Sequence, residues 1–125
     1  MDNLILDESK HTPRIVCNGQ KGEISIVGKA CHEDTFEYYE PVMQWIEDYF
    51  NDTPKKVTTI NLEITSFNAN GSILFFDLLD YLESICDSHN IVVNWIFDKD
   101  NEDGRITGEE LVSDFDALQI NLVSK

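Results

Sequence analysis

The sequence predicts an α/β domain in which helices pack on a mixed β-sheet. Segments with β-type alternation and segments with helical spacing follow one another along the chain. Hydrophobic residues make up 42% of the 125 residues, which is enough for one packed core. The predicted order of elements is β-β-α-β-α-β-α-(β), which is typical of an α/β domain. We expect residues 1–11 to form a flexible N-terminal arm and residues 12–125 to form a single domain.

Period-two alternation or continuous short apolar runs predict the strands, which cover residues 13–17, 23–27, 57–64, 91–97 and, with the weakest pattern, 118–123. Apolar residues at three- or four-residue spacing predict helices over residues 33–50, 73–86 and 107–115. Pro41 either kinks the first helix or opens a second helical piece. Ser72 and Thr107 are the predicted N-caps of the second and third helices.

The charge balance excludes two classes of partner. Nine Lys and Arg face twenty-four Asp and Glu, a net charge of −15, and the basic residues are scattered. Binding to nucleic acid or to an anionic membrane surface needs clustered Lys and Arg, so we expect neither. A basic protein partner remains possible, as does a role of the charge in solubility alone.

The location of the protein is predicted from its cysteines and its apolar segments. No apolar stretch approaches the ~20 residues that span a bilayer, and the N-terminus lacks the pattern of a signal peptide. The three cysteines are odd in number and show no CxxC spacing. We therefore expect reduced thiols in a cytoplasmic protein.

The acidic segment 98–110 imitates a calcium loop. Acidic residues alternate there before a glycine, as in an EF-hand. Placing Gly104 at loop position six puts Lys99 at position one, where a carboxylate is needed, and a strand is predicted where the entering helix should be. A solvated acidic turn is the alternative.

Cys86 and His89 have ligand-like spacing, with Cys31 and His32 as further candidates, but adjacent ligands fit one zinc ion poorly. We expect no metal, no cofactor and, because no catalytic motif is present, no enzyme.

The loop at 65–72 lies between a predicted internal strand and the most apolar predicted helix. Such a loop presents backbone N–H groups at a helix N-terminus, where an anionic group is stabilised. The alternative is a capped junction of small polar residues without further function. The window 65–76 contains no acidic residue.

An ordered set of short motifs covers roughly residues 12–123: Thr12-Pro13, Gly28, Glu33, Tyr39-x-Pro41 with Trp45, Phe67-Asn68, Asp77-Leu78-Leu79, Trp95-x-Phe97-Asp98 and Gly108-Glu109-Glu110. With these motifs the chain resembles the SiaC family of bacterial regulatory phosphoproteins, which are small STAS-like domains related in fold to anti-sigma-factor antagonists.

This resemblance implies a partner-switching protein without catalysis of its own. A cognate Ser/Thr kinase phosphorylates a threonine in an Asn-Thr-Ser-Ser loop of the family, and a PP2C-type phosphatase reverses the reaction. The unphosphorylated form binds and activates a diguanylate cyclase, which raises cyclic-di-GMP and favours aggregation or biofilm growth. The resemblance thus assigns partner binding to Phe67, Asn68, Ala69, Asn70, Gly71 and Ser72.

The sequence departs from the family pattern at the modified position. Asn68 matches, but Ala69 replaces the threonine, and Asn70 and Gly71 replace the serines. Ala69 cannot accept phosphate, so the chain is expected to be locked in the unphosphorylated state, either as a natural variant or through an engineered Thr→Ala change. Ser72 is the best substitute acceptor. A STAS-type anti-sigma-factor antagonist and an acidic calcium-binding module are the alternative functions.

Overall fold

The computed structural model describes residues 2–31, 35–52 and 54–125. Within these residues the strands are β1 (Leu4–Leu6), β2 (Arg14–Asn18), β3 (Glu23–Ala30), β4 (Thr58–Phe67), β5 (Ile91–Phe97) and β6 (Gln119–Ser124). The helices are α1 (Thr35–Asn51), α2 (Ala69–Ile85) and α3 (Glu102–Asp114).

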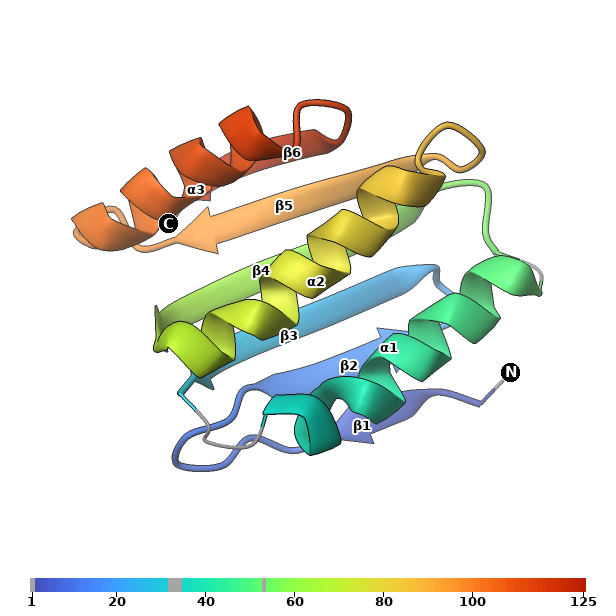
Figure 1. Cartoon of the computed structure of the whole chain (residues 1–125), viewed down its shortest axis with the longest axis horizontal. Helices are drawn as coiled ribbons and strands as arrows, with labels where there is room; N and C mark the ends of the chain where they lie inside the picture. Colours follow the sequence, from blue (N-terminus) through green and yellow to red (C-terminus); the bar gives the residue numbers. More distant parts are fainter. Residues whose placement is uncertain (1, 32–34, 53) are drawn as a thin grey trace.

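The described strands form one six-stranded sheet in the order of the sequence, β1-β2-β3-β4-β5-β6. β2 is antiparallel to both of its neighbours, β1 and β3, and β3 to β6 are parallel. Each parallel pair is joined through one helix. Because such crossovers are right-handed and always advance to the next strand, the helices lie on the same face of the sheet (Figure 1). The predicted α/β fold with a mixed sheet is confirmed.

The structure contains a strand, β1, that the sequence did not predict. Leu4 pairs with Cys17 and Leu6 with Ile15 in an antiparallel ladder, so the prediction of a flexible arm is wrong over these residues. The indole N–H of Trp45 on α1 also donates to the carbonyl of Asp2 at 2.8 Å. Three residues are too few to show a periodicity, which is why pattern analysis missed this strand.

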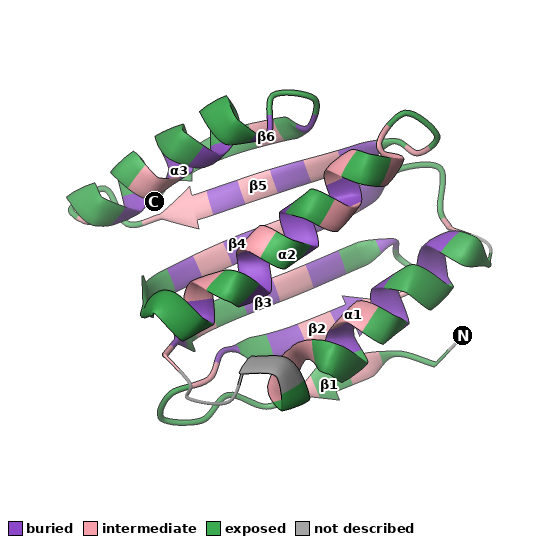
Figure 2. Ribbon diagram, in the orientation of Figure 1, coloured by how far each residue is buried: buried purple, intermediate pink, exposed green. Residues whose placement is uncertain are grey.

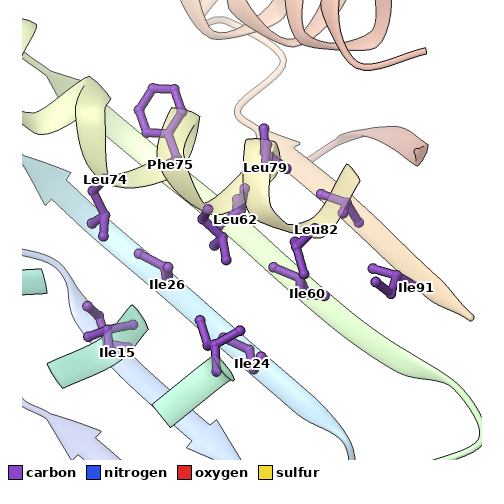
Figure 3. Close-up of a cluster of buried hydrophobic side chains, with 14 of the residues drawn as sticks. Ile15, Ile24, Ile26, Ile60, Leu62, Leu74, Phe75, Leu79, Leu82 and Ile91 are labelled. Atoms are coloured by element: carbon purple, nitrogen blue, oxygen red, sulfur yellow. The ribbon is translucent and has the colours of Figure 1, made fainter. Parts of the chain in front are cut away.

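The core lies between the sheet and the helices. Alternate residues of β4 and β5 are buried against the helices, whereas the residues between them are only half-buried (Figure 2). Figure 3 shows Leu74 of α2 near Ile26 of β3, and Leu82 of α2 near Ile60 of β4. These side chains are essentially inaccessible to solvent, and burial of each contributes about 1.5–3 kcal/mol. Helix α2 is therefore fixed over the middle of the sheet.

The opposite face of the sheet carries a row of asparagines. Asn61, Asn94 and Asn121 are neighbours on β4, β5 and β6. The amide of Asn94 donates to Asn61 at 2.9 Å, and that of Asn121 donates to Asn94 at 3.1 Å. This ladder satisfies polar groups that would otherwise need water, and it holds the register of the three parallel strands.

Helix α1 resolves the alternative that Pro41 left open. The helix is continuous over Thr35–Asn51 with Pro41 inside it. Pro41 is exposed, whereas Val42, Ile46 and Tyr49 are buried against the sheet. Packing of this apolar stripe offsets the backbone hydrogen bond that proline cannot make.

The environments of the three thiols predict unequal reactivity. Cys17 is fully buried on β2, and burial raises the pKa of its thiol to about 12. Cys31 and Cys86 are half-buried free thiols.

Because the thiolate is the reactive form, Ellman's reagent should modify Cys31 and Cys86 in the native protein at neutral pH and modify Cys17 only after denaturation. Cys31→Ser should lower the native count by one. Equal reaction rates for all three thiols in the native protein would contradict this prediction.

Candidate functional site

Helix α2 begins one residue after β4 ends, with Asn68 as its N-cap. The backbone of Asn68 is extended, with φ −107° and ψ −176°, and its side-chain oxygen accepts a hydrogen bond from the N–H of Gly71 at 2.6 Å. The N–H of Ser72 donates to the carbonyl of Asn68 at 2.9 Å. The loop predicted at 65–72 is therefore mostly the end of β4 and the first turn of α2.

The prediction that Ser72 is the N-cap of α2 is wrong. Ser72 lies within the first turn of α2, and its hydroxyl donates to the carbonyl of Ala69 at 2.8 Å. The helical spacing of apolar residues becomes visible only from Ile73, so the sequence pattern placed the start four residues too late. Asn is as good an N-cap as Ser, and here it is the residue whose backbone leaves the strand.

Gly71 allows the first turn of α2 to touch the end of β3. A Cβ atom at position 71 would lie 1.4 Å from the carbonyl oxygen of Ala30 and 2.3 Å from its carbonyl carbon. The N–H of Asn68 also donates to that oxygen at 3.2 Å. Both contacts are with backbone atoms, which cannot move away by a rotamer change as a side chain can. They fix the N-terminus of α2 against the C-terminal end of β3.

Position 69 is exposed as a consequence. Ala69 is the first residue of α2, and its neighbours Asn68 and Asn70 are exposed as well. A hydroxyl at this position would be open to an enzyme. The N-terminus of a helix also favours a negative charge placed near it, by about 0.3–1 kcal/mol at an exposed site.

A β-bulge changes the pairing register of β3 and β4 near the end of β4, just before this turn. Gly28 of β3 is opposite Ile64, but Lys29 is opposite Ser66, so Thr65 is an extra residue in β4. Gly28 has a φ of +128°, a conformation that other residues rarely adopt. Bulges of this kind are common next to functional sites because they redirect side chains.

A cavity of about 380 Å³ separates the end of β4 from the start of α3. It lies at the C-terminal ends of parallel strands, which is where open α/β sheets bind ligands. Its lining consists of Ile64, Thr65, Ser66, Phe67, Asn101, Asp103, Gly104, Ile106 and Thr107. The structure thus brings Phe67, a predicted partner-binding residue, next to the acidic segment that the sequence analysis treated separately.

Helix α3 differs from its prediction. It begins at Glu102 rather than at 107, with Asn101 as N-cap and the N–H of Gly104 donating to the Asn101 side chain at 3.1 Å. Thr107 is therefore inside the helix. Arg105 bridges Glu102 and Glu109 at 3.2 and 2.7 Å, and these carboxylates raise its pKa. Such pairs stabilise the helix within a segment whose acidity suggested a turn.

The same helix removes the loop that a calcium site of EF-hand type requires. Residues 102–110 are helical, so oxygen atoms at alternate positions cannot surround one ion. Over residues 2–31, 35–52 and 54–125, no group of three or more His, Cys, Asp and Glu side chains could hold a metal ion. His32, one of the zinc candidates, and Glu33 of the family motifs lie outside the described residues.

Several of the sequence motifs meet in space. The phenol of Tyr39 on α1 donates to Asp77 on α2 at 2.8 Å, and this hydrogen bond raises the pKa of Tyr39. The indole N–H of Trp95 donates to the carbonyl of Gly104 at 2.9 Å. A Cβ at Gly108 would lie 2.6 Å from the Trp95 ring. These contacts join α1 to α2, and β5 to α3.

Sequence reasoning missed the part of the cavity formed by α3. Asn101, Asp103, Ile106 and Thr107 line the cavity, but their sequence context resembled only an acidic turn. The sequence feature that could have indicated this cavity is Ile106, an apolar residue within an acidic segment. Its side chain is 42% exposed in the structure. Its exposure depends on how α3 packs on β5.

A family model described as "SiaC family regulatory phosphoprotein" matches residues 6–125. The chain belongs to the SiaC family. A curated relative, an uncharacterized protein of Pseudomonas aeruginosa (strain UCBPP-PA14), is 26% identical over 115 residues, which are 91% of this chain and 90% of the relative.

Solved structures of SiaC have the same fold. A chain from the crystal structure of the diguanylate cyclase SiaD in complex with its activator SiaC from Pseudomonas aeruginosa superposes with a TM-score of 0.90 and 23% identity, over 98% of this chain and 99% of that chain. SiaC of Pseudomonas aeruginosa, solved in another structure, gives 0.86 at 21% identity with both chains fully covered. Apo-SiaC gives 0.84 at 21% identity, over 100% of this chain and 99% of that chain.

None of the helices in the described part of the chain has the length and apolar character needed to cross a bilayer.

The contact at Gly71 predicts a large effect of a small substitution. Gly71→Ala must displace either α2 or the end of β3, so we expect it to lower the free energy of unfolding by about 1–3 kcal/mol or more. Ser72→Ala, which removes only an exposed-side hydrogen bond in the same turn, should cost less than about 1 kcal/mol. Chemical denaturation followed by circular dichroism measures both values. Equal stability of Gly71→Ala and the wild type would show that the close approach to Ala30 is absent in solution.

Proposed function

We propose that this chain is a non-enzymatic, partner-switching signalling protein of the cytoplasm that binds and activates a diguanylate cyclase. Its similarity over nearly the whole chain to the fold of SiaC, an activator solved together with the cyclase SiaD, carries the proposal. The exposed start of α2 and the adjacent cavity supply a surface on which a partner can act. Free thiols at all three cysteines agree with a reducing compartment.

We further propose that the first turn of α2 is the place where the family's switch operates. A cognate kinase and a PP2C-type phosphatase would act on a hydroxyl at position 69, which is exposed at the first residue of the helix. A phosphate there adds about −1.5 to −2 charges and three acceptor oxygens. Because Ala69 has no hydroxyl, the chain stays in the binding-competent form.

The packing of the turn supports a natural origin of Ala69. Three consecutive positions, Ala69, Asn70 and Gly71, depart from the Asn-Thr-Ser-Ser pattern, whereas an engineered Thr→Ala change alters one. Gly71 in particular is required by the contact with Ala30, since any Cβ would overlap that carbonyl. The turn as a whole is thus adapted to the residues that it contains.

Ser72 is poorly placed to replace the missing threonine. Ser72 is half-buried as a residue, and its hydroxyl is already engaged as a donor to the carbonyl of Ala69. Phosphorylation would remove that donor from the first turn, so we propose a structural role for Ser72.

Cyclase activation is the direct test of the proposed function. The purified chain, added to the diguanylate cyclase of the same host, should increase the rate at which GTP is converted to cyclic-di-GMP, measured by chromatography. The protein alone should convert no GTP. A cyclase rate unchanged at saturating concentrations of the chain would contradict the proposal.

Restoring the hydroxyl should restore the switch. With the cognate kinase and ATP, Ala69→Thr should gain about 80 Da, the mass of one phosphate group, and the modified protein should lose cyclase activation. The wild-type chain should gain no mass under the same conditions. Ala69→Thr/Ser72→Ala serves as the control, because it should be modified as fully as Ala69→Thr. A gain of mass on Ser72 of the wild type would overturn the locked state.

A further inference from the structure

Two exposed apolar side chains line the cavity between β4 and α3. Phe67 of β4 and Ile106 of α3 both line the cavity and are 39% and 42% exposed. The Phe67 ring is held in place from below by an edge-to-face contact with buried Phe75, at a centroid distance of 5.1 Å. A large apolar side chain whose position is fixed by the core, yet remains accessible, is typical of a contact point for another protein.

A second cavity of about 240 Å³ adjoins the first. It shares Ile64, Thr65 and Asn101 with the first cavity and extends along the end of β5. We call the two cavities together the 101 groove, after Asn101 between them. The groove lies at the C-terminal ends of β4 and β5, and its lining residue Phe67 directly precedes Asn68, the N-cap of α2.

The charges of the 101 groove are negative. Asp103 lines the first cavity, and Glu63, Asp98 and Lys125 line the second. Lys125 binds Glu63 at 2.7 Å, which neutralises that pair. Within the described residues, Asp98 and Asp103 are exposed and form no salt bridge, so no basic side chain neutralises them, although Asp98 accepts a hydrogen bond from the N–H of Asp100. The matching partner surface is therefore basic and carries an apolar residue.

We propose that the 101 groove receives a basic segment of the diguanylate cyclase, which inserts an apolar side chain between Phe67 and Ile106. This proposal rests on the proposed function and names the surface that performs it. The carboxylates steer a Lys- or Arg-containing segment toward the groove, and burial of the apolar side chain supplies most of the affinity.

The groove also explains how position 69 can control binding. Position 69 is exposed and comes two residues after Phe67, which lines the first cavity. A phosphate beside an apolar contact must lose its hydration when the partner docks, and that desolvation opposes binding. Modification can thus act without movement of the core.

Matched substitutions on α3 test the proposal, with the purified cognate cyclase as the probe. Ile106→Ser should weaken binding about tenfold or more, because it removes a buried apolar contact. Val112→Ser is the control, since Val112 is 39% exposed on the same helix but lines neither cavity. Isothermal titration calorimetry measures both affinities, and circular dichroism verifies that both variants are folded.

Charge substitutions test the basic character of the partner segment. Asp103→Asn should weaken binding about two- to fivefold at low salt and reduce the dependence of the affinity on salt. Glu110→Gln, on α3 but outside the groove, should change neither value. The cyclase activation assay should follow the same order of variants.

The outcomes separate the two proposals. If the wild type activates the cyclase but Ile106→Ser and Asp103→Asn behave like their controls, only the groove is wrong as the docking site. If the wild type neither binds nor activates the cyclase, the proposed function fails as well. If the two substitutions abolish binding of the cognate kinase and leave cyclase binding intact, the groove serves the kinase and the assignment to the cyclase is overturned.

Discussion

The contact between the first turn of α2 and the end of β3 is the constraint on which the site depends. The carbonyl of Ala30 accepts from the N–H of Asn68 and lies where a Cβ of residue 71 would be. Since both partners are backbone, the geometry leaves little freedom. It fixes the position of the N-cap and of the first turn of α2, in which position 69 is exposed.

The arrangement of the sheet explains why the site is open to partners. Every parallel crossover advances by one strand, so the helices cover one face and the C-terminal ends of β3, β4 and β5 emerge together at one edge of the sheet (Figure 1). The β-bulge at Thr65 changes the register of β3 and β4 at that edge. The packed core therefore holds the first turn of α2, the cavity between β4 and α3, and the side chains of Phe67 and Ile106 in fixed positions.

The acidity of the chain has different roles in different places. On α3, Glu102 and Glu109 hold Arg105 and stabilise the helix, whereas Asp103 faces the cavity. The window 65–76 carries no acidic residue. A phosphate added at position 69 would therefore be a large local change, even in a chain with a net charge of −15.

The sequence alone determined the α/β class, most strand and helix positions and the resemblance to the SiaC family, because apolar periodicity and short motifs are local properties. It missed β1, which is too short for a period, and it started α2 and α3 too late, because the caps Asn68 and Asn101 precede the first apolar residues of each helix. Tertiary structure alone decided that Gly71 must lack a side chain and that Ile106 and Phe67 line the same cavity. Both facts depend on residues distant in sequence, whose approach is set by packing over the whole sheet.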